Sequence, residues 1–109
     1  MAGPDRIPVH NAATGEIITV VVESGIGGVG AAVDAGATAA RGWRAIGAVA
    51  RGDAVAAFGD AVAAAADELA LIDARNAGNP ITGMRRGALQ GARTLRYFAG
   101  LSLQLTGET

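Results

Sequence analysis

The stretch that decides the fold is DAVAAFGDAVAAAADELALIDA, residues 53–74. Its apolar side chains recur at intervals of three and four residues, which places them along one side of a helix: Val55, Phe58, Val62, Ala65, Leu69 and Ile72. The aspartates of the same stretch fall elsewhere on the helical wheel: Asp53, Asp60, Asp67 and Asp73. The spacing therefore predicts an amphipathic helix from about residue 53 to residue 74.

The segment that follows contains a helix stop and then a second helical pattern. Asn76-Ala77-Gly78-Asn79-Pro80 combines residues that close a helix with a proline that sets the direction of the next segment. A further helix is expected over about residues 82–103, and one of its sides is formed by small and apolar residues: Met84, Ala88, Ala92, Leu95, Ala99 and Ser102. Another side carries three arginines, Arg86, Arg93 and Arg96.

Before the first of these helices, the sequence predicts a β-hairpin over residues 7–22. Two apolar, β-branched runs are separated by Asn11-Ala12-Ala13-Thr14-Gly15, and the glycine suits a left-handed turn position. Ser24 can cap a helix over about residues 26–44, with an apolar face made of Ile26, Val29, Val33, Ala37, Ala40 and Trp43. The expected fold class is α+β, mostly α: a hairpin followed by three helices.

The glycines between residues 25 and 30 match the pattern G-x-G-x-x-G, which suits a dinucleotide loop between a strand and a helix. Such a site also needs a second strand that ends in an acidic residue about 20 positions later. Asp53 is the nearest candidate, but the residues before it, Ala45 to Gly52, make a poor strand. With 17 glycines in 109 residues, a chance match is plausible, and a glycine-loosened helix entry is the favoured interpretation.

Glycines inside the predicted helices raise a doubt about independent folding. There are seven of them: Gly30, Gly36, Gly42, Gly59, Gly87, Gly91 and Gly100. Each costs roughly 0.8 to 1 kcal/mol relative to alanine, so together they cost about 6 kcal/mol, comparable with the stability of a small domain. We expect the chain to be marginal alone and its apolar faces to need more partner surface.

Composition excludes several kinds of chemistry. The chain has no cysteine and no lysine, which excludes disulfides, thiolate nucleophiles, Schiff bases and P-loops. Its one histidine, His10, has no neighbouring ligand residue and is interpreted as a strand or turn residue, and the aspartates at 60, 67 and 73 as a solvated helix face. We predict no catalytic, cofactor-binding or metal-binding residue.

Charge and hydropathy bear on partners and location. The net charge is −1, although residues 75–109 carry five arginines against one acid. Aromatic residues near those arginines are few, so nucleic-acid binding is not expected. The longest uncharged run, Tyr97 to Gly107, is too short to span a membrane, and no signal segment is visible. We expect a cytoplasmic protein.

Taken in order, the landmarks of the chain resemble the N-terminal segment of the NAD(P)-dependent aldehyde dehydrogenase superfamily. Residues 11–18 resemble the Asn-Pro-Ala-Thr-Gly-Glu hairpin of that family, with Ala12 in place of its proline. The first two family helices are matched by Ala31-Ala32-Val33-Asp34-Ala35 with Gly42-Trp43-Arg44, and by Ala65-Ala66-Asp67-Glu68-Leu69-Ala70. The connector resembles Asn76 to Ile81, and the most specific match is Leu95-Arg96-Tyr97-Phe98-Ala99-Gly100-Leu101, closed by Gly107-Glu108-Thr109.

The resemblance implies an oxidoreductase that acts on aldehydes with NAD or NADP. It also implies that the oxyanion asparagine, the cofactor-binding residues, the general-base glutamate and the nucleophilic cysteine lie beyond residue 109. The departures include residues 46–53, where the family has a Pro-rich, acidic helix entry. We therefore expect a truncated chain, inactive and without cofactor by itself, whose partner is the missing remainder of the enzyme or a second copy. The alternative is a helical interaction module that self-associates or docks on an acidic partner.

Overall fold

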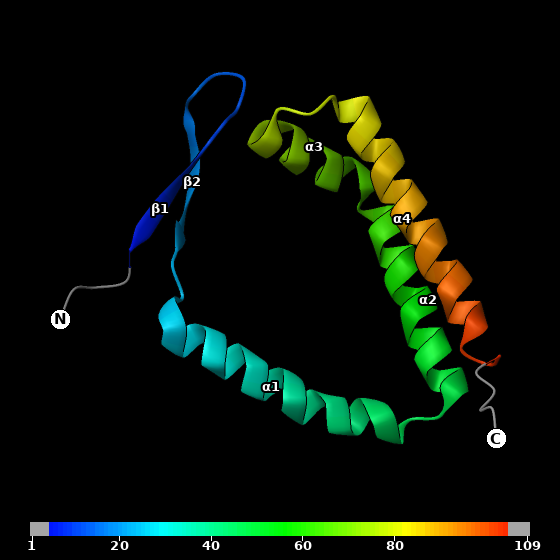
Figure 1. The fold of residues 1–109 in the computed structure, drawn as a ribbon. Helices are drawn as coiled ribbons and strands as arrows, with labels where there is room; N and C mark the ends of the chain where they lie inside the picture. Colours follow the sequence, from blue (N-terminus) through cyan, green and yellow to red (C-terminus); the bar gives the residue numbers. More distant parts are fainter. Residues whose placement is uncertain (1–4, 105–109) are drawn as a thin grey trace.

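The computed structural model describes residues 5–104 and consists of a hairpin followed by helices (Figure 1). The elements are β1 (Arg6–His10), β2 (Ile17–Val22), α1 (Gly25–Ala45), α2 (Ala48–Ala64), α3 (Ala66–Ala77) and α4 (Ile81–Leu101). The predicted α+β, mostly helical fold class is confirmed. The described residues contain four helices where the periodicity predicted three.

The hairpin forms as its turn chemistry predicts. β1 and β2 pair antiparallel, from Arg6 opposite Val22 to His10 opposite Ile17, with an irregularity between Val9 and His10. In the turn, Gly15 has a φ of 75° and donates its N–H to the carbonyl of Asn11 at 2.8 Å. The ring Nδ1 of His10 lies 3.0 Å from the Gly15 carbonyl oxygen. His10 is thus a strand residue that supports the turn.

The helix expected over residues 53–74 differs from the structure in two ways. It begins earlier, at Ala48, and it is divided at Ala65, whose φ of −90° and ψ of 8° leave the helical range. Backbone bonding continues across this position, because Ala65 N–H donates to Ala61 and Leu69 N–H donates to Ala65. The interruption is therefore a bend between α2 and α3. Apolar spacing passes through it unchanged, so the periodicity could not reveal it.

The bend lets two consecutive helices pack on α4. Buried residues of α2 and α3 are Gly52, Gly59, Ala66 and Ala70, and those of α4 are Ala92 and Ala99. Neither buried glycine leaves room for a side chain. A β-carbon at Gly59 would lie 3.0 Å from the Ala92 carbonyl oxygen, and one at Gly52 would lie 3.0 Å from the Ala99 carbonyl oxygen. The helix backbones therefore approach closely along a seam of small residues.

This seam corrects the predicted core face of the helix at 53–74. Half of the predicted side is half-buried, namely Val55, Val62 and Ala65. The other half is exposed, namely Phe58, Leu69 and Ile72, whereas Gly59 and Ala66 are buried. The predicted side of the last helix is confirmed, because the residues from Met84 to Ser102 that it comprises are buried or half-buried. Small residues carry little hydrophobic signal, so periodicity selected the larger side chains instead.

The helix boundaries follow recognisable signals, with one exception. α3 ends at Gly78, which has a left-handed φ of 75° and donates its N–H to the Ala74 carbonyl. Pro80 precedes the first turn of α4. Ser24 precedes α1 as predicted, but its side chain makes no capping hydrogen bond, so the expected cap is wrong in that detail. Its backbone carbonyl instead accepts the N–H of Gly28 at 3.1 Å.

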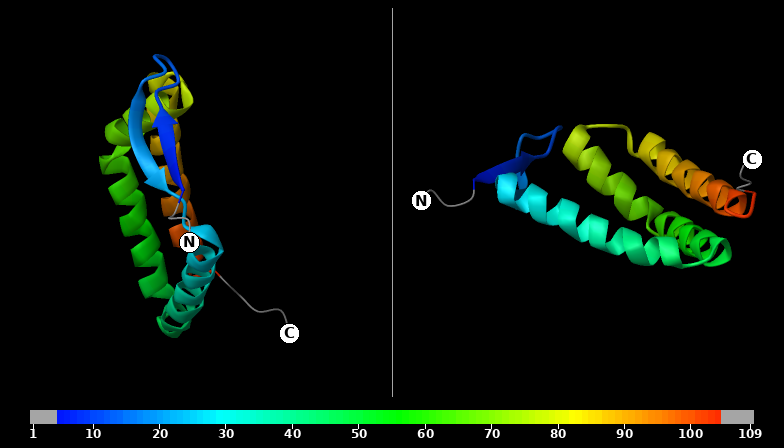
Figure 2. Two further views of the ribbon diagram at one scale, coloured as in Figure 1. Left: turned by 90° about the vertical axis from the view of Figure 1, so that its left-hand side faces the viewer. Right: turned by 60° about the horizontal axis from the view of Figure 1, so that its bottom comes forward.

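The chain is open rather than closed around one core. α1 lies apart from the α2–α4 pair, on the other side of an arch that the hairpin completes (Figures 1 and 2). The radius of gyration is 18.6 Å, against about 13 Å for a compact domain of this length. The accessible surface is 8224 Å², against about 5,500 Å² for a folded monomer of this mass. Much apolar surface is therefore left in contact with water.

Candidate functional site

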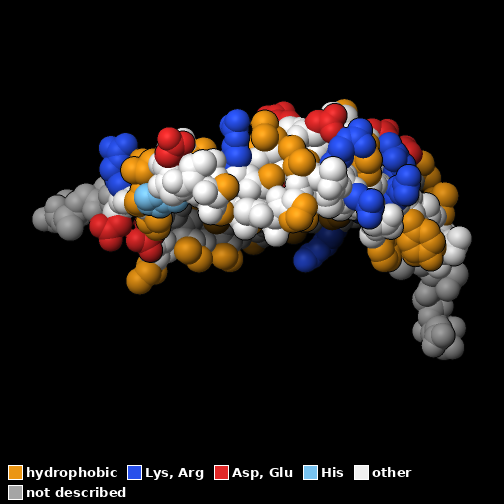
Figure 3. Space-filling model, turned by 90° about the horizontal axis from the view of Figure 1, so that it is seen from above, with side chains coloured by type: hydrophobic (Ala, Val, Ile, Leu, Met, Phe, Trp, Pro, Cys, Tyr) orange, Lys and Arg blue, Asp and Glu red, His pale blue; other side chains and the backbone are white. Residues whose placement is uncertain are grey.

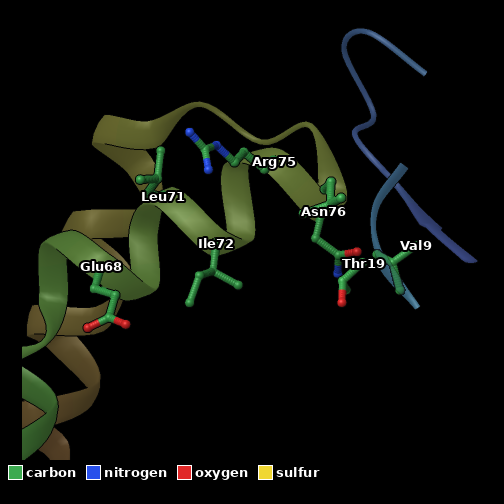
Figure 4. A pocket seen from close by; sticks show the side chains of 8 residues that line it. Val9, Thr19, Glu68, Leu71, Ile72, Arg75 and Asn76 are labelled. Carbon is green, nitrogen blue, oxygen red and sulfur yellow. The ribbon is translucent and has the colours of Figure 1, made fainter. Parts of the chain in front are cut away.

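A cleft of about 440 Å³ lies between the hairpin and α3 (Figure 4). Its lining is mainly apolar, with a few polar groups at the rim: Val9, Ile18, Thr19, Glu68, Leu71, Ile72, Arg75 and Asn76. In Figure 4 the Asn76 amide points toward Thr19, while the Arg75 guanidinium turns back along α3.

Local backbone contacts hold the two walls of this cleft together. The N–H of Ala12 in the hairpin turn donates to the carbonyl of Arg75 at 2.9 Å. A β-carbon at Gly78 would lie 3.1 Å from the Ala12 β-carbon, so the turn also rests on the connector after α3. These contacts position the hairpin against α3 with little side-chain packing.

The cleft lacks the groups that catalysis of aldehyde oxidation requires. The chain contains no cysteine to attack a carbonyl carbon. Glu68 and Arg75 are the ionisable residues that line the cleft, and both are exposed. Among residues 5–104 there is no group of three or more His, Cys, Asp or Glu that could hold a metal ion. The arrangement suits binding of an apolar group or chain segment.

The glycine motif at residues 25–30 forms the first turns of α1. Gly25 has a φ of 60°, and a β-carbon at Gly28 would lie 2.6 Å from the Ser24 β-carbon, so both glycines serve the entry into the helix. Asp53 lies within α2 and not at the end of a strand. The sheet of the described region is the two-stranded antiparallel hairpin, so the motif stands outside any parallel β-α-β unit there.

The structure divides the arginines of α4 into two kinds. Arg96 donates through Nε and Nη2 to Asp60 Oδ1, at 2.7 and 2.5 Å, and Arg85 pairs with Asp67. These pairs cross from α4 to α2 and α3. The three arginines of the predicted stripe therefore differ in role. Arg96 forms an ion pair between α4 and α2, while Arg86 and Arg93 are exposed.

Sequence reasoning missed these ion pairs. It treated Asp60 and Asp67 as a solvated face, and their side chains are indeed 65% and 80% exposed. The only signal in the sequence was the presence of aspartates in the segment 53–74 and of arginines in the helical segment that follows. Because pairing across helices depends on the rotation of each helix about its axis, spacing alone could not select Arg85 and Arg96 as the partners.

Many large apolar side chains are exposed, and some of them are scattered over the face shown in Figure 3. The predicted apolar face of α1 is present, but Ile26 is 94% exposed and Val33 is 64% exposed. Every residue of β2 is exposed as well. None of the described helices combines the length and apolar character needed to cross a membrane.

Comparison with known proteins identifies the family of this chain. The model of the aldehyde dehydrogenase family matches residues 1–109. The chain is also 33% identical over 98 residues to the aldehyde dehydrogenase tropH of Talaromyces stipitatus. That match covers 90% of this chain and 19% of the fungal protein, so the chain spans about a fifth of the length of this relative. The chain belongs to the aldehyde dehydrogenase family.

Proposed function

We propose that this chain forms the N-terminal part of an NAD- or NADP-dependent aldehyde dehydrogenase and has no catalytic activity without further polypeptide. The observation that carries the proposal is the exposed apolar face of α1, from Ile26 to Trp43. All 109 residues of the chain lie within the match to the family. A helix whose apolar stripe faces water gains stability when another surface covers that stripe. The remainder of the enzyme is the natural source of such a surface.

The residue types in the chain also support a role for residues 1–109 as scaffold and a role for other residues in catalysis. Aldehyde oxidation through a covalent intermediate needs a nucleophile that attacks the carbonyl carbon, and a base that later activates water. The 109 residues contain no cysteine, and the carboxylates on α2 and α3 lie on exposed helix faces, two of them engaged by arginines. The nucleophile, the base and the nicotinamide site would all come from residues outside this sequence. Residues 1–109 would contribute scaffold.

A chimera tests this proposal. Residues 1–109 would replace the matched segment of the Talaromyces enzyme, and reduction of NAD and NADP would be followed with a panel of aliphatic and aromatic aldehydes. We expect no turnover by the 109-residue chain and turnover by the chimera. Gly59→Leu, which separates α2 from α4, should abolish activity of the chimera, whereas Gly91→Leu, at an open position, should not. Turnover by the chain alone, or a folded chimera without activity, would contradict the proposal.

A second candidate function is self-association as a helical interaction module, with a second copy covering the apolar faces. The specific observation that favours it is the large accessible surface of the chain. The difference between this surface and that of a folded monomer of the same mass is greater than the roughly 1,600 Å² that a standard protein interface buries. Light scattering after size-exclusion separates the two candidates. A stable dimer of the 109-residue chain would favour self-association, and a monomer would favour docking on the rest of an enzyme. A cytoplasmic location and the absence of nucleic-acid partners remain part of the proposal.

A further inference from the structure

The two edges of the hairpin differ in their capacity to accept another strand. Glu23 N–H donates to the Asp5 carbonyl at 2.9 Å, and inward-facing backbone groups alternate along an antiparallel pair. From the register, the residues of β2 that face β1 are therefore Thr19, Val21 and Glu23. The backbone N–H and C=O groups of Val20 and Val22 consequently face outward, whereas Ile18 is the unpaired extra residue where the register shifts.

The outer edge of β1 is blocked by its sequence. The same alternation turns Arg6, Pro8 and His10 outward on that strand. Proline has no N–H to donate, and charged residues on an edge discourage pairing. The outer edge of β2 has neither safeguard, since Ile17 to Val22 contains no charge, no proline and no glycine. Of the two edges, only that of β2 presents an N–H at its central outward residue, Val20, because the facing residue of β1 is Pro8.

The outer edge of β2 is also accessible. Within residues 5–104, the sheet consists of β1 and β2 alone. All six residues of β2 are exposed, and none of the backbone groups of Ile18, Val20 and Val22 has a hydrogen bond outside the hairpin. An extended peptide can add to such an edge through main-chain hydrogen bonds, while alternate side chains provide specificity.

Charge at the ends of β2 defines the kind of strand that fits. Glu16 and Glu23 bracket the strand, and neither forms an ion pair with the described residues. An acidic residue at either end of an incoming strand would lie near one of these carboxylates. Like charges directly opposite destabilise a sheet. A strand with a basic residue at each end would be attracted instead.

We infer that β2 accepts an extended, β-branched strand with a basic residue at each end, supplied by the rest of the aldehyde dehydrogenase polypeptide. The inference rests on the proposed function for the source of that strand. The matched fungal enzyme has about four-fifths of its length outside the match, which leaves ample chain to provide one. The added strand would convert the hairpin into a three-stranded sheet and cover its open edge.

A peptide probe tests the chemistry of this edge on the intact 109-residue chain. The probe has six alternating valine and threonine residues between two lysines. One control has glutamates at the ends, and another is N-methylated at alternate residues so that it cannot pair. Binding is followed by fluorescence anisotropy and by hydrogen exchange of individual amides. We expect the lysine-flanked probe to bind and to slow exchange at Val20 and Val22, with both controls at least roughly tenfold weaker.

Two variants sharpen the test. Val20→Pro removes the central outward N–H and should weaken binding roughly tenfold, while the matched Val20→Thr keeps the N–H and should bind as the parent does. Because proline could disturb the hairpin, the double variant Glu16→Lys with Glu23→Lys provides an independent readout. It leaves the backbone unchanged and should reverse the preference, so that the glutamate-flanked probe binds more tightly.

Several outcomes would overturn the inference. These are equal binding of the N-methylated probe, protection that appears at β1 and not at β2, and an unchanged preference after charge reversal. Concentration-dependent protection of β2 without any probe would show that a second copy is the occupant. The proposed function is judged separately by the chimera. An active chimera with no probe binding would overturn only the strand site, and probe binding with an inactive chimera would overturn only the proposed function.

Discussion

The α2–α4 pair and the region formed by the hairpin and α1 differ in how far their residues are buried. The helix pair closes on itself with small residues, and Ala92 is fully buried against α2. In α1 no residue is buried, although large apolar side chains such as Ile26, Val33 and Trp43 recur along one of its faces. Burial in this chain therefore follows the availability of a partner surface rather than the strength of the hydrophobic pattern. The hairpin and α1 leave their apolar side chains exposed, whereas α2, α3 and α4 bury residues against one another.

The largest effect is expected from Gly59→Leu, which tests whether close backbone approach maintains the helix pair. A β-carbon there already meets the Ala92 carbonyl and Leu95, so a leucine should destabilise the pair by about 3 kcal/mol. Urea unfolding monitored by circular dichroism measures the change. Gly91→Leu is the matched control, because a β-carbon at Gly91 has no neighbour within 4 Å. Equal effects at both positions would disprove the close-packing account.

The next effect tests whether α1 is independent of the pair. Gly30 and Gly36 have open space around them, so replacing both with alanine should stabilise α1 by about 2 kcal/mol in total. The gain should appear as slower hydrogen exchange within α1, while the urea midpoint of α2 and α4 stays the same. A midpoint that rises with the substitutions would show that α1 is coupled to the pair in solution.

A smaller effect is expected from the ion pairs that cross the helix seam. Asp60→Asn and Asp67→Asn should each cost about 0.2 to 1 kcal/mol, because the partner side chains are well exposed. The loss should shrink in high salt, where exposed charges are screened. Asp73→Asn provides the control, since Asp73 has no ion-pair partner among the described residues. A cost as large as that of Gly59→Leu would mean that charge, not close packing, maintains the seam.

The smallest effect concerns the apolar face of α1. In the 109-residue chain, Val33→Ser should change the unfolding free energy by no more than about 0.5 kcal/mol, since the side chain is already exposed. In the active chimera the same substitution should cost about 1.5 to 3 kcal/mol, because Val33 would then be covered. Thermal melts of both proteins measure the difference. A large loss in the short chain would show that α1 already packs there.

The comparison also shows where sequence reasoning succeeded. Local chemistry placed the hairpin turn at Gly15, the end of α3 at Gly78 and the packed side of α4, because each depends on residues within a few positions of one another. It failed for the packed side of α2 and α3. Gly59 was counted as a cost to the helix, whereas in the structure it permits contact with the Ala92 carbonyl.

The candidate interaction surfaces also combine features that are visible in the sequence with features that depend on the tertiary structure. The apolar stripe of α1 and the uncharged β2 strand are visible in the sequence, and so is the absence of a nucleophile. That the stripe remains uncovered, and that Pro8 blocks one edge of the hairpin while β2 stays open, depends on which elements come together. The cleft between hairpin and α3 arises from one backbone bond between Ala12 and Arg75, 63 positions apart, and no local pattern indicates it.

The sequence by itself determined the hairpin with its turn at Gly15, the helix end at Gly78, the family and the absence of cysteine, because these depend on local backbone preferences and on residue identity. The tertiary structure decided the bend at Ala65, the glycine and alanine seam, the pairing of Arg85 and Arg96, and the exposure of α1. The physical reason is that packing depends on the distance and rotation between elements. Small residues permit close helix packing but contribute little to the hydrophobic pattern of the sequence. Large apolar residues dominate that pattern, yet in α1 they are exposed.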